Sequence, residues 1–294
     1  MAINHNAMRG RSGQTVRLTV AQAIVRYLSV QYSIADGQRQ RFIPATLGIF
    51  GHGNVAGLGQ ALHQYSESMP FVQGRNEQGL THAAVAFAKA NKRRSALAVT
   101  ASIGPGAMNT VTAAALATVN RLPVLLLPGD IYATRHQGPV LQQLEHPMGP
   151  DISVNDAFRP ISRFFDRITR PEQLLVALPQ AMRVLANPAE TGAVVISLPQ
   201  DVQSHAYDFP VEFFAERDWM IRRPVPDSEE IAELRGSRKA VFMWIGPGRP
   251  HSAPVLERLT ASRAYPRASS AKPSLSAGAG TSKLARTACP NIAT

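Results

Sequence analysis

The chain contains almost no cysteine and no long hydrophobic run. Its single cysteine, Cys289, permits no internal disulfide and no cysteine-based metal site. No uncharged apolar stretch reaches the roughly 18 residues that a membrane-spanning helix needs. Residues 1–14 form a polar segment without the apolar centre of a signal peptide. These absences predict a cytoplasmic protein with no membrane partner.

Acidic residues are absent from the last part of the chain. The whole sequence holds 31 Lys and Arg against 20 Asp and Glu, but no acid follows Glu257. Much of the net charge of +11 therefore comes from this last part. The remaining basic residues are scattered, whereas nucleic-acid-binding proteins gather them in a patch or stripe. We therefore predict no nucleic-acid partner.

Residues 260–294 also lack regularly spaced large apolar side chains. Ala, Ser, Pro, Gly and Thr dominate this segment. Such a composition cannot bury enough apolar surface to offset the entropy lost on ordering. We predict a disordered tail, of the composition that a frame change in the coding sequence would produce.

Aromatic residues make up only 6% of the chain, so aliphatic residues and alanine must form its core. Strands are expected near 42–50, 71–72, 96–100, 123–128 and 193–198, and helices near 19–28, 58–65, 79–90, 105–120 and 171–185. Strands that alternate with helices form a parallel sheet covered on both faces. The sequence therefore predicts an α/β fold with a doubly wound parallel sheet over residues 15–205.

Three other segments interrupt or follow this pattern. Residues 135–167 form a long connection rich in Gly and Pro, which is either a functional loop or a surface insertion. Residues 206–235 are polar and contain several prolines, so we interpret them as a linker. Residues 236–259 read as one strand and one helix, which is the start of a second α/β domain.

A glutamate occupies the junction between a short strand and an alanine-rich helix. Glu77 lies in Gly74-Arg-Asn-Glu-Gln-Gly79, and the turn after the next strand reads Ser102-Ile-Gly-Pro-Gly106. A carboxylate in the first helical turn is favoured by the helix dipole alone, so Glu77 by itself could be a simple cap. The pairing of these two motifs is much rarer and resembles the pyrimidine-binding domain of thiamine-diphosphate (ThDP) enzymes.

Other motifs resemble a subgroup of the acetolactate-synthase-like ThDP enzymes, the trihydroxycyclohexanedione hydrolases of inositol catabolism. They lie at residues 50–59, 128–130 and 136–143. The resemblance implies an enzyme that opens the ring of a small polyol-derived diketone by adding water across a carbon–carbon bond. Two alternatives remain open: another ThDP enzyme of this group, or a pyrimidine-domain fragment without activity.

The resemblance implies roles for individual residues. Glu77 would be catalytic, because its carboxyl group would share a proton with the pyrimidine ring and so promote formation of the nucleophilic ylide. The other expected cofactor contacts are His52, Pro105, Asn109 and Gln143. Each of these residues also has an ordinary interpretation. His52 could be a loop histidine, Pro105 the first residue of a helix and Asn109 a structural amide. For Gln143, a shifted alignment would put Gln142 in its place.

The resemblance also implies a second half of the site. ThDP enzymes bind the diphosphate through Mg²⁺ and a Gly-Asp-Gly motif on another domain, usually of a second subunit. This sequence contains no such motif, since Gly129-Asp130 is followed by Ile131. We therefore expect the Mg²⁺ ligands to lie in a C-terminal domain outside this chain, and the protein to be a homo-oligomer that pairs through its pyrimidine domain.

Overall fold

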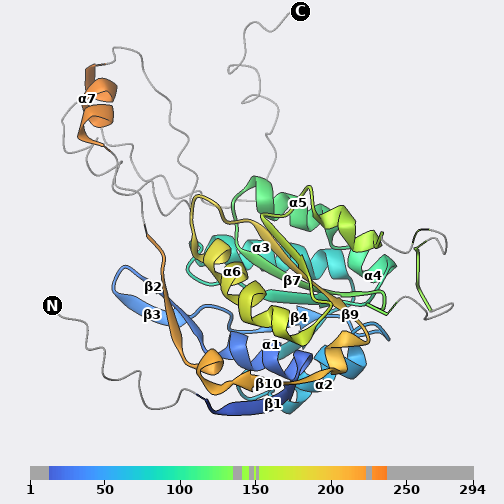
Figure 1. The fold of residues 1–294 in the computed structure, drawn as a ribbon. Coiled ribbons are helices and arrows are strands. Elements are labelled where there is room, and N and C mark those ends of the chain that lie inside the picture. Colours follow the sequence, from blue (N-terminus) through green and yellow to red (C-terminus); the bar gives the residue numbers. More distant parts are fainter. Residues whose placement is uncertain (1–12, 135–140, 146–148, 150–151, 223–226, 237–294) are drawn as a thin grey trace, which may run out of the picture. The chain divides into compact units, whose positions relative to one another are not determined.

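The computed structural model describes residues 13–134, 141–145, 149, 152–222 and 227–236. Residues 13–222 belong to one compact unit, and helix α7 (Ser228–Gly236) belongs to a second unit. Figure 1 shows the elements of the first unit. The predicted disordered tail lies outside the described residues, and so does the predicted second α/β domain except for its first residue, Gly236.

In the described part of the chain, the first unit is built around a six-stranded sheet. Its spatial order is β5 (Phe71–Gln73), β4 (Thr46–Gly48), β6 (Ala98–Ala101), β7 (Val124–Asp130), β9 (Ala193–Pro199) and β8 (Phe164–Arg167). All neighbouring strands are parallel. From β4 the chain passes to β5 on one side, and then to β6 on the other side of β4. The strand order therefore reverses between β4 and β6, as in the predicted doubly wound fold.

Helices cover both faces of this sheet (Figure 1). One face packs against α1 (Val20–Ser29) and α6 (Leu174–Ala186), and the other against α3 (Glu77–Ala90) and α5 (Val111–Val119). Shorter helical segments are α2 (Gln60–Gln64), α4 (Pro105–Met108), η2 (Val55–Gly59), η3 (Val154–Phe158), η4 (Pro171–Gln173), η5 (Val202–Ser204) and η6 (Val211–Phe214). None of the described helices is both long and apolar enough to cross a membrane.

The central strands are apolar on both faces, and this explains their uninterrupted hydrophobic runs. On β7, Leu125 and Leu127 pack in the cluster that contains α1 and α6, whereas Val124 and Leu126 pack in the cluster that contains α3 and α5. Successive side chains of a strand point to opposite faces, so a strand between two helical layers needs apolar residues at every position.

Residues 206–220 belong to the first unit, which corrects the expectation that 206–235 is a linker throughout. Strand β10 (Ala206–Pro210) pairs antiparallel with β1 (Thr15–Thr19), and β11 (Arg217–Met220) pairs parallel with β2 (Gln31–Ala35). Between these two strands, Phe213 and Phe214 of η6 are buried in the α1 side of the core. Burial of these two aromatic side chains therefore keeps residues 206–220 in the first unit, although their prolines and charges suggested a linker.

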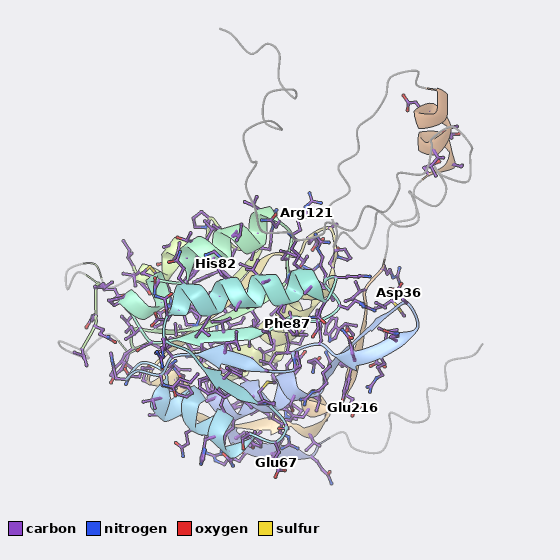
Figure 2. The ribbon with its side chains drawn as sticks, turned by 180° about the vertical axis from the view of Figure 1, so that it is seen from behind. Asp36, Glu67, His82, Phe87, Arg121 and Glu216 are labelled. Carbon is purple, nitrogen blue, oxygen red and sulfur yellow. The ribbon has the colours of Figure 1, made fainter. Side chains whose placement is uncertain are left out.

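A third strand completes the small sheet that β11 and β2 form. Strand β3 (Gln38–Arg41) pairs antiparallel with β2. Figure 2 shows Asp36 in the turn between these strands, and His82 and Phe87 along α3. Asp36 has a positive φ of 54°, which aspartate tolerates better than most residues in such a turn.

Three elements differ from the predicted boundaries. The strand expected at 42–50 shortens to β4, because Pro44 has no amide hydrogen for the ladder. The helix expected at 58–65 begins with the π-helical turn η2. The helix expected at 105–120 divides into α4 and α5, since the Thr110 hydroxyl donates to the Ala107 carbonyl at 2.8 Å and tightens the turn between them.

Candidate functional site

A cavity of about 490 Å³ opens beyond the carboxyl ends of β4, β5 and β6. It includes the point where the strand order reverses, and open α/β sheets bind their ligands at such a point. Its volume lies within the range of small-molecule sites. The lining residues are Ile49, Phe50, Gly51, Glu77, Ser102, Pro105, Gly106, Asn109 and Gln142.

Glu77 brings the only carboxylate among these lining residues. It is the first residue of α3, whose N-cap is Asn76; the Asn76 side chain accepts a hydrogen bond from the Gly79 amide at 2.8 Å. The side-chain amide of Asn109 donates to Glu77 Oε2 at 2.9 Å. The other oxygen, Oε1, faces Gly106, where an added Cβ would lie 3.3 Å from it. One carboxylate oxygen is therefore held by the protein, and the other borders space that a side chain would occupy.

The turn after β6 places the remaining polar groups. Gly104 has a φ of +65°, which glycine adopts at little cost, and Pro105 then begins α4. The break between α4 and α5 follows directly after Asn109, whose amide reaches back to α3. The motif around Pro105 and the motif around Glu77 thus meet in space.

Close packing of two loops forms one wall of the cavity. A Cβ added to Gly51 would lie 2.5 Å from Ser102 Oγ, so only glycine permits this approach. The buried Asn54 accepts from the Gly51 amide at 2.9 Å and donates to Thr100 Oγ1 at 2.9 Å. This amide therefore ties the loop after β4 to strand β6.

The structure brings together three of the five predicted site residues, Glu77, Pro105 and Asn109. Gln142 rather than Gln143 is among the lining residues, and Ser102 Oγ lies 3.4 Å from Gln142 Oε1. Position 104 must be glycine here, because a Cβ would overlap the Gln142 carbonyl oxygen. Sequence reasoning could not choose between two adjacent glutamines, because the choice depends on how the long connection folds back.

His52 lies beside the cavity rather than among its lining residues. Its neighbour Gly51 lines the cavity, whereas His52 Nε2 is buried and has no hydrogen-bond partner in the described part of the chain. Ser102 and Gly106 were part of the sequence motif, but received no role from it. Their position directly after a central strand was the signal that could have identified them.

The cavity suits a nitrogen-containing ring. The Glu77 carboxylate can bind a protonated ring nitrogen, and Phe50 and Pro105 offer apolar surface to the ring. The absence of a side chain at Gly106 leaves the approach to Glu77 Oε1 open. Among the described residues, no group of three or more His, Cys, Asp or Glu side chains is arranged to hold a metal ion.

Comparison with known proteins agrees with this geometry. Residues 47–150 match the family described as "Thiamine pyrophosphate enzyme, N-terminal TPP binding domain", and TPP is the same compound as ThDP. The matched range begins in β4 and includes Glu77, Pro105, Asn109 and Gln142, which line the cavity.

The chain is also similar to longer hydrolases. It is 54% identical over 241 residues to "3D-(3,5/4)-trihydroxycyclohexane-1,2-dione hydrolase" of Geobacillus thermodenitrificans (strain NG80-2), a match of 81% of this chain and 38% of that protein. A protein of the same name from Bacillus thuringiensis (strain Al Hakam) is 55% identical over 238 residues, which are 80% of this chain and 37% of that protein. The chain thus spans well under half the length of these relatives. Its residues 47–150 match the N-terminal TPP binding domain of thiamine pyrophosphate enzymes.

Proposed function

We propose that the chain supplies the pyrimidine-binding half of a ThDP site in a hydrolase that opens the ring of trihydroxycyclohexane-1,2-dione. The observation that carries the proposal is the Glu77 carboxylate, held by Asn109 in a cavity at the reversal of strand order. The similarity to hydrolases named for this diketone supports the substrate class.

Different residues of the cavity would contact different parts of the pyrimidine ring. Glu77 Oε1 would hold and share a proton at a ring nitrogen, while Asn109 keeps the carboxylate in place through Oε2. Phe50 and Pro105 would contact the ring and exclude water from it. Bound ThDP would supply the nucleophilic carbon needed to cleave a carbon–carbon bond.

The remaining contacts and the metal belong to the same proposal. Gln142 would approach the cofactor from the long connection, and His52 and Gln143 stay predicted contacts. Mg²⁺ binds oxygen ligands together with substrate phosphates. We therefore propose that Mg²⁺ and the diphosphate are held by ligands outside the described residues.

Self-association through this domain is part of the proposal. Helix α5 is mostly apolar, with valine, alanine or leucine at seven of its nine positions, and such helices are normally buried. Yet Leu116 is 41% exposed and Val119 is 81% exposed. A second copy of the chain would cover this face. Sedimentation of the chain should therefore show a dimer that Val119→Lys weakens, and a monomer at all concentrations would contradict the proposal.

The test of the activity is a chimera in which residues 15–221 replace the matching segment of the Geobacillus relative. We expect ThDP-dependent ring opening by the chimera. Glu77→Gln should lower turnover by at least about 100-fold, which is typical for loss of a group that shares a proton in the reaction. The melting temperature should stay unchanged, because the amide has nearly the shape of the carboxyl group.

The matched control is Glu67→Gln, which makes the same chemical change outside the residues that line the cavity. Full activity of the Glu77→Gln chimera would contradict the proposed role. A chimera that binds ThDP but leaves the diketone intact would favour another ThDP enzyme of the group. A folded chimera that binds no ThDP would favour a fragment without catalytic function.

A further inference from the structure

In the described part of the long connection between β7 and β8, several backbone amides lie outside strands and helices. Buried backbone amides need hydrogen-bond acceptors wherever regular structure does not supply them. For six amides among the described residues of this connection, the acceptors are carboxylates. The amide of Ile131 donates to Asp130, and the amides of Ala133 and Thr134 donate to Asp201. The amides of Leu144 and Val154 donate to Glu145, and the amide of Ser153 donates to Asp156.

Glu145 joins two parts of this connection. Its Oε2 accepts from the amide of Leu144 at 3.1 Å, and its Oε1 accepts from the amide of Val154 at 3.0 Å. Leu144 lies two residues after Gln142, whereas Val154 begins η3. The carboxylate of Glu145 therefore connects the segment that reaches the cavity to a short helix nine residues further along the chain.

That helix is fixed to the sheet by a buried ion pair. Asp130, at the end of β7, is 1% exposed and accepts from Arg167 Nε at 2.7 Å. Ser153, the N-cap of η3, donates its hydroxyl to the same carboxylate. Arg167 also donates to Asp156 Oδ1 at 3.0 Å. Separating such a buried pair leaves an uncompensated charge, so displacement of this anchor costs free energy.

Towards Gln142, the segment of residues 142–144 packs closely against the wall of the cavity. The carbonyl oxygen of Gln142 lies so close to Gly104 that no Cβ fits between them. The Gln142 side chain approaches Ser102, which follows β6. A displacement of the segment would therefore move Gln142 away from the cavity directly.

We propose that Glu145 is a positioning residue that holds Gln142 at the cavity, with the Asp130–Arg167 pair as its anchor. The proposal rests on the proposed function in one respect only, namely that this cavity receives the pyrimidine ring of ThDP. Glu145 itself touches no ligand in this scheme. It acts through the backbone of residues 142–144.

The first experiment measures hydrogen exchange of the Leu144 and Val154 amides in the whole chain. Glu145→Ala should speed both by a factor of about 2 to 12, the equivalent of one net hydrogen bond. Glu145→Gln keeps an acceptor oxygen and should restore protection of at least one amide. Glu172→Ala is the matched control, because Glu172 makes only an exposed pair with Arg170 at 3.7 Å.

The second experiment measures ThDP affinity in a double-mutant cycle, in the chimera that carries residues 15–221 within the Geobacillus relative. Glu145→Ala and Gln142→Ala should each weaken binding, and the double variant should be no weaker than Gln142→Ala alone, because the residues act through one contact. Losses that simply add would overturn the proposal, as would unchanged exchange in Glu145→Ala. If the chimera described above binds no ThDP before these substitutions are made, the proposed function fails, and exchange at Leu144 and Val154 alone decides whether Glu145 holds the segment.

Discussion

At the scale of single residues, the cavity depends on missing side chains as much as on reactive ones. Gly51, Gly104 and Gly106 each lie where a Cβ would meet another group of the site. At Gly51 and Gly104 the obstacle is Ser102 or backbone, but at Gly106 it is the end of the Glu77 side chain. Gly106 is therefore the position where an added methyl group changes the site without preventing the fold.

We predict that Gly106→Ala weakens ThDP binding while the chain stays folded. Alanine in α4 gains up to about 1 kcal/mol of helix stability over glycine. Its methyl group crowds Glu77 Oε1, and overpacking of about 1–3 kcal/mol corresponds to a roughly 5- to 150-fold higher Kd. Titration calorimetry of the chimera described above with ThDP measures the first effect, and urea unfolding of the chain measures the second.

Gly79→Ala is the control for this substitution. Gly79 lies in α3, two residues after Glu77, and its added Cβ would make ordinary contacts of 3.5 Å and 3.9 Å with Asn76. The control should match Gly106→Ala in helix stabilisation and keep the affinity for ThDP. Equal affinity of the two variants would mean that the space beside Gly106 is not used by the ligand.

At the scale of elements, short capping contacts fix where helices begin. The Thr19 hydroxyl accepts from the Gln22 amide at 3.2 Å, and the Gln22 side chain accepts from the Thr19 amide at 2.9 Å. This capping box begins α1, the helix that packs between the main sheet and the small sheets.

We predict that Thr19→Ala lowers the free energy of unfolding by about 1 kcal/mol, the usual loss for an N-cap. Urea unfolding followed by circular dichroism measures this change. Ser66→Ala, at an exposed position in the turn after α2, is the control and should change stability little. A loss at position 19 no larger than at position 66 would show that the capping box does not stabilise α1.

The anchor of η3 should respond to acid. Partial burial raises the pKa of the Asp156 carboxyl, but hydrogen bonds from Arg159 and Ser153 and the charge of Arg167 outweigh it, so the pKa falls below its ordinary value. A depressed pKa in the folded state stabilises the fold above the unfolded pKa, which is about 3.9. This stabilisation is lost as the pH falls through the lower, folded value.

We therefore predict that Asp156→Asn is less stable than the unaltered chain at pH 7, and that the difference shrinks as the pH falls below about 4. Urea midpoints between pH 7 and pH 3 test this. Asp208→Asn removes an exposed pair with Arg17 and should differ little at any pH. A difference for Asp156→Asn that stays constant across the range would contradict the role of its charge.

At the scale of the whole molecule, the chain matches 37–38% of the length of the relatives compared above. The cavity offers a carboxylate, amides and apolar surface, which suit the pyrimidine ring rather than the diphosphate. The proposed activity therefore needs groups beyond those of the described unit.

We predict that the purified chain shows no ring opening of the diketone when ThDP and Mg²⁺ are added. The chimera described above serves as the positive control in the same assay, so that substrate and cofactor quality are known. Turnover by the chain alone that disappears when ThDP is removed would contradict this prediction.

Part of this fold and site could be predicted from the sequence alone. Apolar runs at every position predicted strands between two helical layers, and β7 and β9 are such strands. The helix expected near 19–28 is α1. The motifs around Glu77 and Asn109 predicted one site through their resemblance to the pyrimidine-binding domain of ThDP enzymes. Each of these signals depends on residues that lie close together in the sequence.

Only the tertiary structure decided the rest. Residues 206–220 read as a linker, but they pair with strands nearly 190 residues earlier in the chain. Gln142 lines the cavity because Glu145 and the Asp130–Arg167 pair bring the connection back to β6. The sequence by itself determined the strands, the helix caps and the glutamate motif. Contacts between residues far apart in the chain leave no regular spacing in the sequence, so only the folded structure decided which glutamine and which glycines complete the site.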